Sequence, residues 1–125
     1  MKRPGKSIVC TAACLAMLVL GGCRSNWIDA DVQNQTLGPV HELEVAYPTA
    51  SFGANSLAEG AVYRYRFQVR DSGSVRVDYV LPDGKTVHAE GLNLNEQDRG
   101  QLTIRLLPQG KVEFLPSWSV SHFGK

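Results

Sequence analysis

Residues 63–81 read YRYRFQVRDSGSVRVDYVL, and this stretch decides the fold. Large apolar side chains occupy every second position on both sides of a polar centre. They are Tyr63, Tyr65, Phe67 and Val69 before it, and Val75, Val77, Tyr79 and Leu81 after it. A strand with one face in the core and the other in water has this period of two. The polar centre, Asp71-Ser72-Gly73, is typical of a tight turn closed by glycine. The stretch therefore predicts an antiparallel hairpin.

The same alternation recurs along the rest of the chain. It is present at residues 28–32, 43–47, 102–106 and 112–114, and no segment after residue 23 keeps the period of an amphipathic helix. About seven short strands joined by turns over residues 27–116 predict an all-β domain. We expect a small antiparallel immunoglobulin-like sandwich, with a small open barrel as the alternative.

Three short turns, each ending in glycine, predict how the strands pair. The turns are residues 71–73, 82–84 and 108–110. Pairing across them places Arg66 opposite Asp78, Arg76 opposite Glu90 and Arg105 opposite Glu113 on outer faces, and Tyr65 opposite Tyr79, Phe67 opposite Val77 and Ile104 opposite Phe114 on inner faces. Opposite-charge and aromatic cross-strand pairs each stabilise a sheet by about 0.2–1 kcal/mol. These registers bring apolar faces together and pair charges at the same time.

The composition excludes several classes of protein. The chain has 125 residues, which is the size of one domain. Its hydrophobic content of 43% is too high for a fully disordered chain, and its three cysteines are too few for a disulfide-dense scaffold. The net charge of +1 gives no reason to expect nucleic acid as a partner.

The N-terminal residues have the composition of an export signal. Three basic residues among the first six precede the uncharged apolar run Ile8–Leu20. This run is shorter than the roughly 20 residues that a membrane-spanning helix needs, and it has the length of the apolar part of a signal peptide. Leu20-Gly21-Gly22-Cys23 follows. Residues 1–22 could also be an ordinary cleaved signal peptide or an uncleaved membrane helix.

Leu20-Gly21-Gly22-Cys23 resembles the lipobox of bacterial lipoproteins. The resemblance implies a helical signal peptide over residues 1–22, cleavage between Gly22 and Cys23, and fatty acids on Cys23. Residues 23–26 would then be a lipidated tether. Arg24 stands where lipoproteins retained in the inner membrane typically carry aspartate. In a cell with two membranes, the resemblance therefore implies the outer membrane, with the domain facing the periplasm.

Residues 47–55 are predicted to form a long connection with Phe52 in a loop. Their sequence, YPTASFGAN, resembles the Tyr-Pro-x-x-Ser-Phe-Gly stretch of small uncharacterised bacterial envelope lipoproteins. That family brings no known activity. Phe52 either anchors a partner or covers the end of the core, and we favour the cover. Residues 117–125 are predicted to be a polar C-terminal tail.

An arginine row on the outer faces could bind an anionic glycan or phosphate; its members are Arg64, Arg66, Arg70 and Arg76. The predicted registers give two of the four acidic partners, and they leave Arg64 and Arg70 as the possible ligand or partner surface. We expect a solvated outer face there. The three histidines, His41, His88 and His122, are scattered and lack the spacing of metal ligands. No metal or cofactor is expected.

No nucleophile, base and oxyanion site converge in the sequence. The sequence favours a lipid-anchored protein of the cell envelope that acts as a non-enzymatic binding or structural module. Its partners would be the membrane, through the lipid, and an unknown envelope protein or glycan. An accessory subunit that pairs through a strand edge is the alternative, and an enzyme is less favoured.

Overall fold

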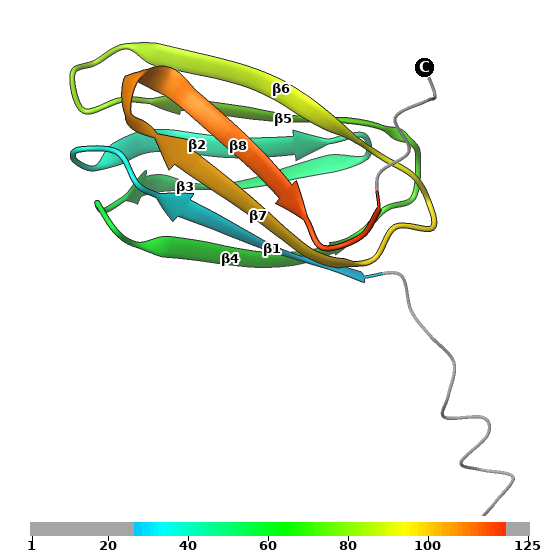
Figure 1. Cartoon of the computed structure of the whole chain (residues 1–125). Coiled ribbons are helices and arrows are strands. Elements are labelled where there is room, and N and C mark those ends of the chain that lie inside the picture. The colour runs from blue at the N-terminus through cyan, green and yellow to red at the C-terminus, as the bar shows by residue number, and fades with distance from the viewer. Residues whose placement is uncertain (1–26, 120–125) are drawn as a thin grey trace, which may run out of the picture.

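The computed structural model describes residues 27–119, and these residues form an all-β domain, as the alternation predicts (Figure 1). Its strands are β1 (Trp27–Asn34), β2 (Val40–Tyr47), β3 (Ala50–Leu57), β4 (Val62–Gln68), β5 (Gly73–Val80), β6 (Thr86–Leu94), β7 (Gly100–Leu107) and β8 (Lys111–Pro116). A short 3-10 turn, η1 (Pro108–Gly110), joins the last two strands. Within residues 27–119, no helix has the length and apolarity to cross a membrane. The predicted signal peptide and tether lie outside the described residues.

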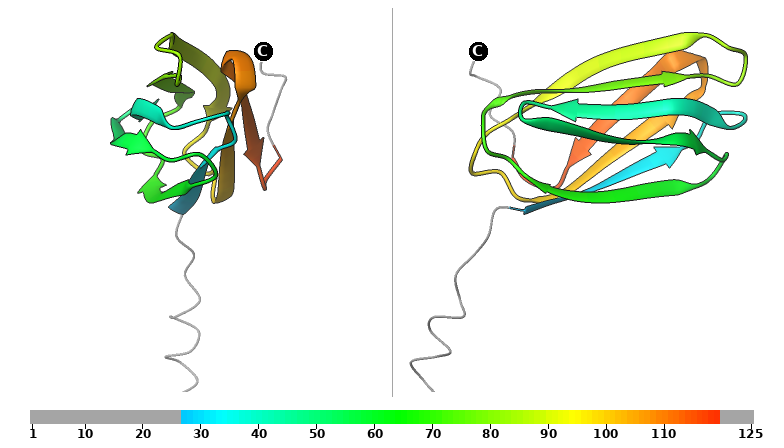
Figure 2. Two further views of the ribbon diagram at one scale, coloured as in Figure 1. Left: turned by 90° about the vertical axis from the view of Figure 1, so that its left-hand side faces the viewer. Right: turned by 180° about the vertical axis from the view of Figure 1, so that it is seen from behind.

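The strands form two four-stranded sheets that pack as a sandwich (Figures 1 and 2). Sheet A has the order β4-β1-β7-β8, and sheet B has the order β3-β2-β5-β6. β1 and β7 are parallel, while the other strand pairs are antiparallel. The architecture is therefore a sandwich and not an open barrel.

Three details of the predicted sandwich are wrong. There are eight strands instead of about seven. The additional strand is β3, which the sequence does not reveal because its residues are mostly small and polar and show little alternation. In an immunoglobulin sandwich the first two strands pair in one sheet, whereas β1 and β2 lie in different sheets here. The parallel β1–β7 pair also breaks the expected antiparallel pattern. It joins strands far apart in the chain, a contact that turn residues cannot reveal.

The predicted hairpin over residues 63–81 is also wrong. β4 lies in sheet A and β5 in sheet B, so the segment between them crosses from one sheet to the other. Arg66 therefore faces Asp29 instead of Asp78, and Tyr65 and Phe67 face Ala30 and Ile28 instead of Tyr79 and Val77. Alternation tells which face of a strand is buried, but β1 and β5 both offer β4 an alternation of apolar and polar residues with an acidic residue opposite Arg66.

The other two predicted hairpins are confirmed. Arg76 pairs with Glu90 across β5 and β6. Ile104 pairs with Phe114 across β7 and β8, and Arg105 lies 3.2 Å from the carboxylate of Glu113. In both hairpins the turn is short and the strands stay in one sheet, so the turn geometry alone sets the register.

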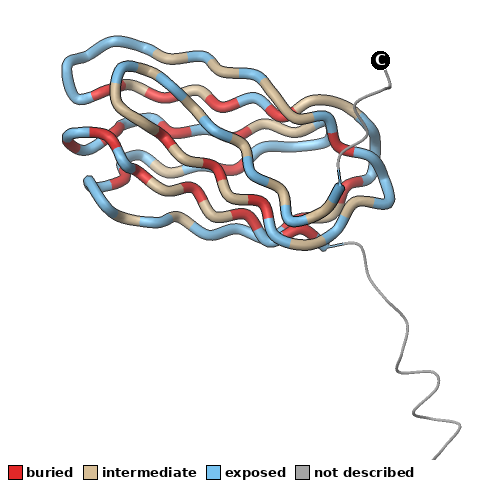
Figure 3. Tube along the Cα trace, viewed as in Figure 1, coloured by how far each residue is buried: buried red, intermediate tan, exposed pale blue. Residues whose placement is uncertain are grey.

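The core lies between the inner faces of the two sheets (Figure 3). Buried and exposed residues alternate along β1, β5 and β7, as the period of two requires. The largest fully buried side chains are Tyr79, Ile28, Leu94, Leu102, Ile104 and Leu106. Burial of this size is the main source of stability for a domain without disulfides.

One long side of the sandwich, between β3 and β4, is closed by stacked aromatic rings. Phe52 stacks on Tyr65 with 4.3 Å between ring centroids, and Tyr47 stacks on Phe67 at 4.2 Å. Tyr63 lies at 6.1 Å from Phe52. Because Tyr65 stands at this edge, it is 39% exposed and not fully buried as the alternation implies.

The strands run back and forth along the sandwich, so its two ends are distinct (Figure 1). β1 begins with Trp27 at one end, which we call the tether end. Residues 35–39, 81–85 and 108–110 connect strands at the opposite end, which we call the far end.

Candidate functional site

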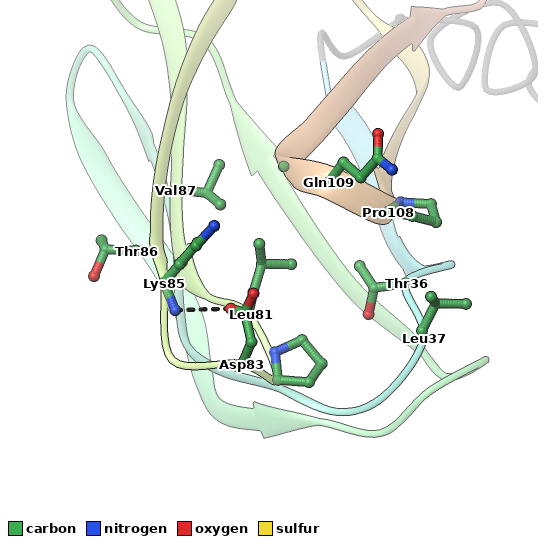
Figure 4. A pocket seen from close by; sticks show the side chains of 11 residues that line it. Thr36, Leu37, Leu81, Asp83, Lys85, Thr86, Val87, Pro108 and Gln109 are labelled. Atoms are coloured by element: carbon green, nitrogen blue, oxygen red, sulfur yellow. Dashed lines mark hydrogen bonds between the residues drawn. The ribbon is translucent and has the colours of Figure 1, made fainter.

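A pocket of about 540 Å³ opens at the far end between three loops (Figure 4). The loops are residues 35–39, 81–85 and 108–110, and the start of β6 completes the lining. The apolar lining comes from Leu37, Leu81, Pro82, Val87 and Pro108. Concave sites with mostly apolar walls and a few polar groups are the usual form of binding pockets.

A buried asparagine organises the first of these loops. Asn34 is fully buried, and its Oδ1 accepts hydrogen bonds from the backbone N–H of Thr36 at 3.0 Å and from the Thr36 hydroxyl at 2.6 Å. Its Nδ2 donates to the carbonyl oxygens of Gly38 and Leu57, both at 2.9 Å. The loop is thereby fixed in one shape, with Leu37 at 81% exposure.

The other two loops are held by their own turns. In the β5–β6 loop, Asp83 Oδ1 accepts from the N–H of Lys85 at 3.0 Å. Gly84 has a φ of 94°, a conformation that favours glycine. In η1, Gln109 has a φ of 69°, which is uncommon for a residue with a side chain. The pocket therefore has preformed walls.

The loop of residues 35–39 also contacts the loop of residues 81–85. Pro82 lies so close to Gly38 that a Cβ there would meet its ring carbons at 3.0 and 3.1 Å. The sequence places Leu81 on a core face and predicts the turns at 82–84 and 108–110, but it does not indicate a pocket between them. The Asn34-Gln35-Thr36 pattern was the available signal, because asparagine followed two positions later by threonine favours a side-chain-closed turn at a strand end.

Arg64 and Arg70, the two arginines that the predicted registers leave without acidic partners, lie apart in the structure. Nε of Arg64 lies 3.5 Å from Asp31, so Arg64 has an acidic partner after all. Arg70 lies beyond the end of β4, and its guanidinium donates to Gln68 Oε1 at 2.8 Å. Six positions of nearly extended chain separate the two arginines by about 20 Å. They do not form one site.

Arg66 also has an acidic partner. Nε of Arg66 lies 3.4 Å from Asp29, and its guanidinium lies 5.0 Å from the ring centre of Trp27. Asp29, Asp31 and the two arginines on β4 line a shallow groove on the outer face of sheet A. Exposed ion pairs of this kind add little stability, and their charges largely cancel.

Removal of the two predicted arginine charges is expected to have a small effect. Arg64→Gln with Arg70→Gln should change the free energy of unfolding by less than about 1 kcal/mol, because both side chains are solvated. A denaturation curve measures this. We expect no binding to lipopolysaccharide that depends on these charges; salt-sensitive binding lost in the folded double variant would contradict a solvated face.

Phe52 lies in strand β3 and not in a loop, which corrects the prediction for residues 47–55. β2 and β3 form a tight hairpin, and the ring of Phe52 packs into the aromatic side of the core with 7% of the residue exposed. It covers the core along a side of the sandwich and offers little surface to a partner. Gly22 and Cys23 lie outside the described residues.

The titratable side chains of residues 27–119 include one close pair of a histidine and a carboxylate. Nδ1 of His88 lies 2.6 Å from Asp78 Oδ1 on the outer face of sheet B, and no three potential metal-ligating side chains come together in this part of the chain. Burial raises the pKa of the Tyr79 phenol, so the hydroxyl stays neutral at physiological pH. His122 lies outside the described residues.

Comparisons with known proteins give a likeness of fold. No family model and no curated protein matches the sequence. The structure is similar to the NMR structure of a protein from Eubacterium rectale, with a TM-score of 0.54 and 15% sequence identity. The similar region covers 78% of this chain and 97% of that chain. At this identity the likeness shows a shared sandwich fold alone.

Proposed function

We propose that this chain is a lipid-anchored protein of the bacterial cell envelope that acts as a non-enzymatic binding module. Cys23 would carry the lipid, and the far-end pocket would receive the partner. In a cell with two membranes we place it at the outer membrane, facing the periplasm, because Arg24 follows the cysteine. The proposal combines the lipobox-like N-terminus with the position of the pocket.

The single observation that carries the proposal is the position of the pocket at the end opposite Trp27. Three residues separate Cys23 from Trp27, which limits the span between them to about 14 Å. The eight residues of β1 extend the sandwich by about 26 Å from there. A lipid on Cys23 would therefore hold the tether end near the membrane and present the pocket to the periplasm.

The exposure of Trp27 supports the same orientation. The residue is 37% exposed at the start of β1, within the reach of a membrane-anchored Cys23. Tryptophan is enriched at membrane–water interfaces, where its ring is buried among headgroups while its N–H stays hydrated. A sandwich tied this closely to a bilayer would place Trp27 at that level.

The pocket favours binding over catalysis. Its walls are mostly apolar, and two of its polar side chains are bonded within the domain: Thr36 to Asn34, and Asp83 to the backbone of Lys85. A reaction would need a nucleophile next to an ordered base. An accessory subunit that pairs through a strand edge remains the second candidate, since the outer strands of both sheets have free edges within residues 27–119.

Replacement of Cys23 by Ser tests the anchor. The full chain is expressed in bacteria with an alkyne-labelled fatty acid, and label on the protein is measured after gel separation. We expect Cys23→Ser to lose all label, because the thiol is the site of lipidation. Cys14→Ser, which removes a cysteine from the apolar run, should keep it. Equal label on wild type and Cys23→Ser would contradict the proposal.

A further inference from the structure

β6 offers a free edge to another polypeptide. It is an outermost strand of sheet B, and within residues 27–119 no strand pairs with its second edge. Its first five residues keep a regular antiparallel register with β5, from Thr86 opposite Val80 to Glu90 opposite Arg76. In such a strand, alternate residues point their N–H and C=O groups outward. These groups form a template for one more strand.

The other outer strands are better protected than the first half of β6. β8 carries Lys111 and Pro116, and the exposed arginines of β4 are charged. The rings that stack between β3 and β4 bring those two strands side by side. Lys and Pro are common blocks to strand addition, and residues 86–90 contain neither, with Glu90 as their one charged side chain. Sheet A approaches β6 at two points: Phe114 lies beside Gly91, beyond this run, and Gly110 lies beside Val87 within it.

The pocket adjoins this edge. Thr86 and Val87, the first two residues of β6, belong to its lining, and Leu37 stands on the other side (Figure 4). Leu37 is exposed on a loop that Asn34 and Thr36 hold in place. A leucine presented in a fixed position can contact a partner without a further ordering cost. An open strand edge and an apolar pocket thus meet at one point.

We propose that an extended segment of a partner protein adds to the edge of β6 over Thr86–Glu90 and inserts one bulky apolar side chain into the pocket. Main-chain hydrogen bonds would supply part of the affinity, and the pocket would select the side chain. The inference deepens the proposed binding role by naming the class of ligand, and it does not depend on the anchor.

The side chains along the edge specify the ligand further. Half-buried Val87 and Ala89 alternate with exposed His88 and Glu90, so the segment has apolar residues at every second position. Across an antiparallel pair, the carboxylate of Glu90, which accepts from the Ser74 hydroxyl, favours a basic neighbour. Nδ1 of His88 is bonded to Asp78, which leaves its Nε2 for a carboxylate on the added strand. The peptide acetyl-Thr-Lys-Val-Glu-Leu-Thr-amide meets these requirements, with its leucine opposite Val87 next to the pocket.

The test is an NMR titration of the isotope-labelled full chain, in detergent micelles, with this peptide at up to millimolar concentration. We expect shift changes and slower amide exchange at residues 86–90, with methyl shifts at Leu37 and Val87. A peptide with alternate amide nitrogens methylated should not bind, because it lacks the donors. Replacement of the peptide leucine by alanine should weaken binding about tenfold.

Two alanines on outer strands give a matched pair of variants. Both Ala89 of β6 and Ala54 of β3 are half-buried. Ala89→Lys should abolish binding by placing a charge on the edge, whereas Ala54→Lys should leave it unchanged. Leu37→Ser alters an exposed side chain, so this variant should fold normally. Its affinity for the peptide should fall about tenfold.

Four outcomes would overturn the proposal: no shift change at millimolar peptide, shift changes that map to β3, equal binding of the methylated peptide, or full affinity in folded Ala89→Lys. If Ala89→Lys gives no folded spectrum, the methylated peptide and Leu37→Ser decide the question. The labelling of Cys23→Ser tests the lipid anchor alone, and the titration tests peptide binding at β6 alone. Failure of one proposal can therefore be distinguished from failure of the other.

Discussion

Gly53→Ala is expected to destabilise the domain by at least about 3 kcal/mol, the largest loss among the single substitutions considered. Gly53 lies on β3 opposite Glu44. A Cβ on Gly53 would overlap the carbonyl oxygen of Leu43 and lie 2.9 Å from its carbonyl carbon and 3.0 Å from the Cα of Glu44. These are main-chain atoms of the neighbouring strand, so the clash cannot be relieved by turning a side chain.

An irregularity in β2 lies beside this close approach. The register of β2 with β5 shifts between His41 and Glu44, and Glu42 has a φ of 53°. Such a β-bulge bends the strand that contains it. Chemical denaturation measures the effect, and Gly60→Ala is the control. Gly60 has open space around it and a φ of 79°, so we expect a loss of about 1–2 kcal/mol there. A smaller loss for Gly53→Ala than for Gly60→Ala would contradict the predicted clash.

Asn34→Ala is expected to lower the free energy of unfolding by about 2–4 kcal/mol. The substitution leaves the carbonyl of Leu57 and the N–H of Thr36 without the partners that they have in the buried site. Each buried polar group that loses its partner costs about 1–3 kcal/mol. The second expected effect is local: amide exchange over residues 35–39 should become faster, since the loop loses the side chain that holds it.

A matched control distinguishes this role from general sensitivity of the strand end. Gln33→Ala removes a neighbouring amide whose side-chain hydrogen bond, to Gln35, is exposed. We expect a change of less than about 0.5 kcal/mol for this variant. If Asn34→Ala were as stable as Gln33→Ala, the hydrogen-bond network would not be what fixes the loop. Peptide binding at β6 should weaken in Asn34→Ala, because Leu37 would no longer be held in position.

The sequence predicts the buried faces well and the strand partners less well. Ile28 and Ile104 are buried as their alternation requires, and the turns at 82–84 and 108–110 set the registers of β5–β6 and β7–β8. The turn at 71–73 also has three residues and ends in glycine, yet β4 and β5 lie in different sheets. The alternation of apolar residues is a local property of one strand, whereas the choice between two partner strands depends on contacts with distant parts of the chain.

β3 shows a second limit of sequence reasoning. Its residues Ser51, Gly53 and Asn55 are typical of loops, and Phe52 and Leu57 are its only large apolar residues. The strand exists because β2 supplies its hydrogen bonds and because the ring of Phe52 stacks on Tyr65. Tertiary contacts of this kind commonly outweigh β-propensity.

The candidate site is less predictable from the sequence than the fold. The predicted register pairs β4 with β5 and leaves Arg64 without an acidic partner, but β4 pairs with β1 instead. The pocket, in contrast, depends on three loops that are far apart in the sequence, and its organiser, Asn34, carries no charge. Neither composition nor alternation reveals that an asparagine side chain is buried and hydrogen-bonded. The role of Asn34 in fixing the loop is therefore evident only from the structure.

The intact mass of the protein extracted from bacterial membranes with detergent tests the central claim most directly. The account predicts a chain that begins at Cys23 and carries diacylglycerol on the thiol and a fatty acid on the new amino group. Fragmentation should assign the whole added mass to the N-terminal peptide. A chain that retains Met1, or one that begins at Cys23 or beyond with no added lipid, would contradict the account.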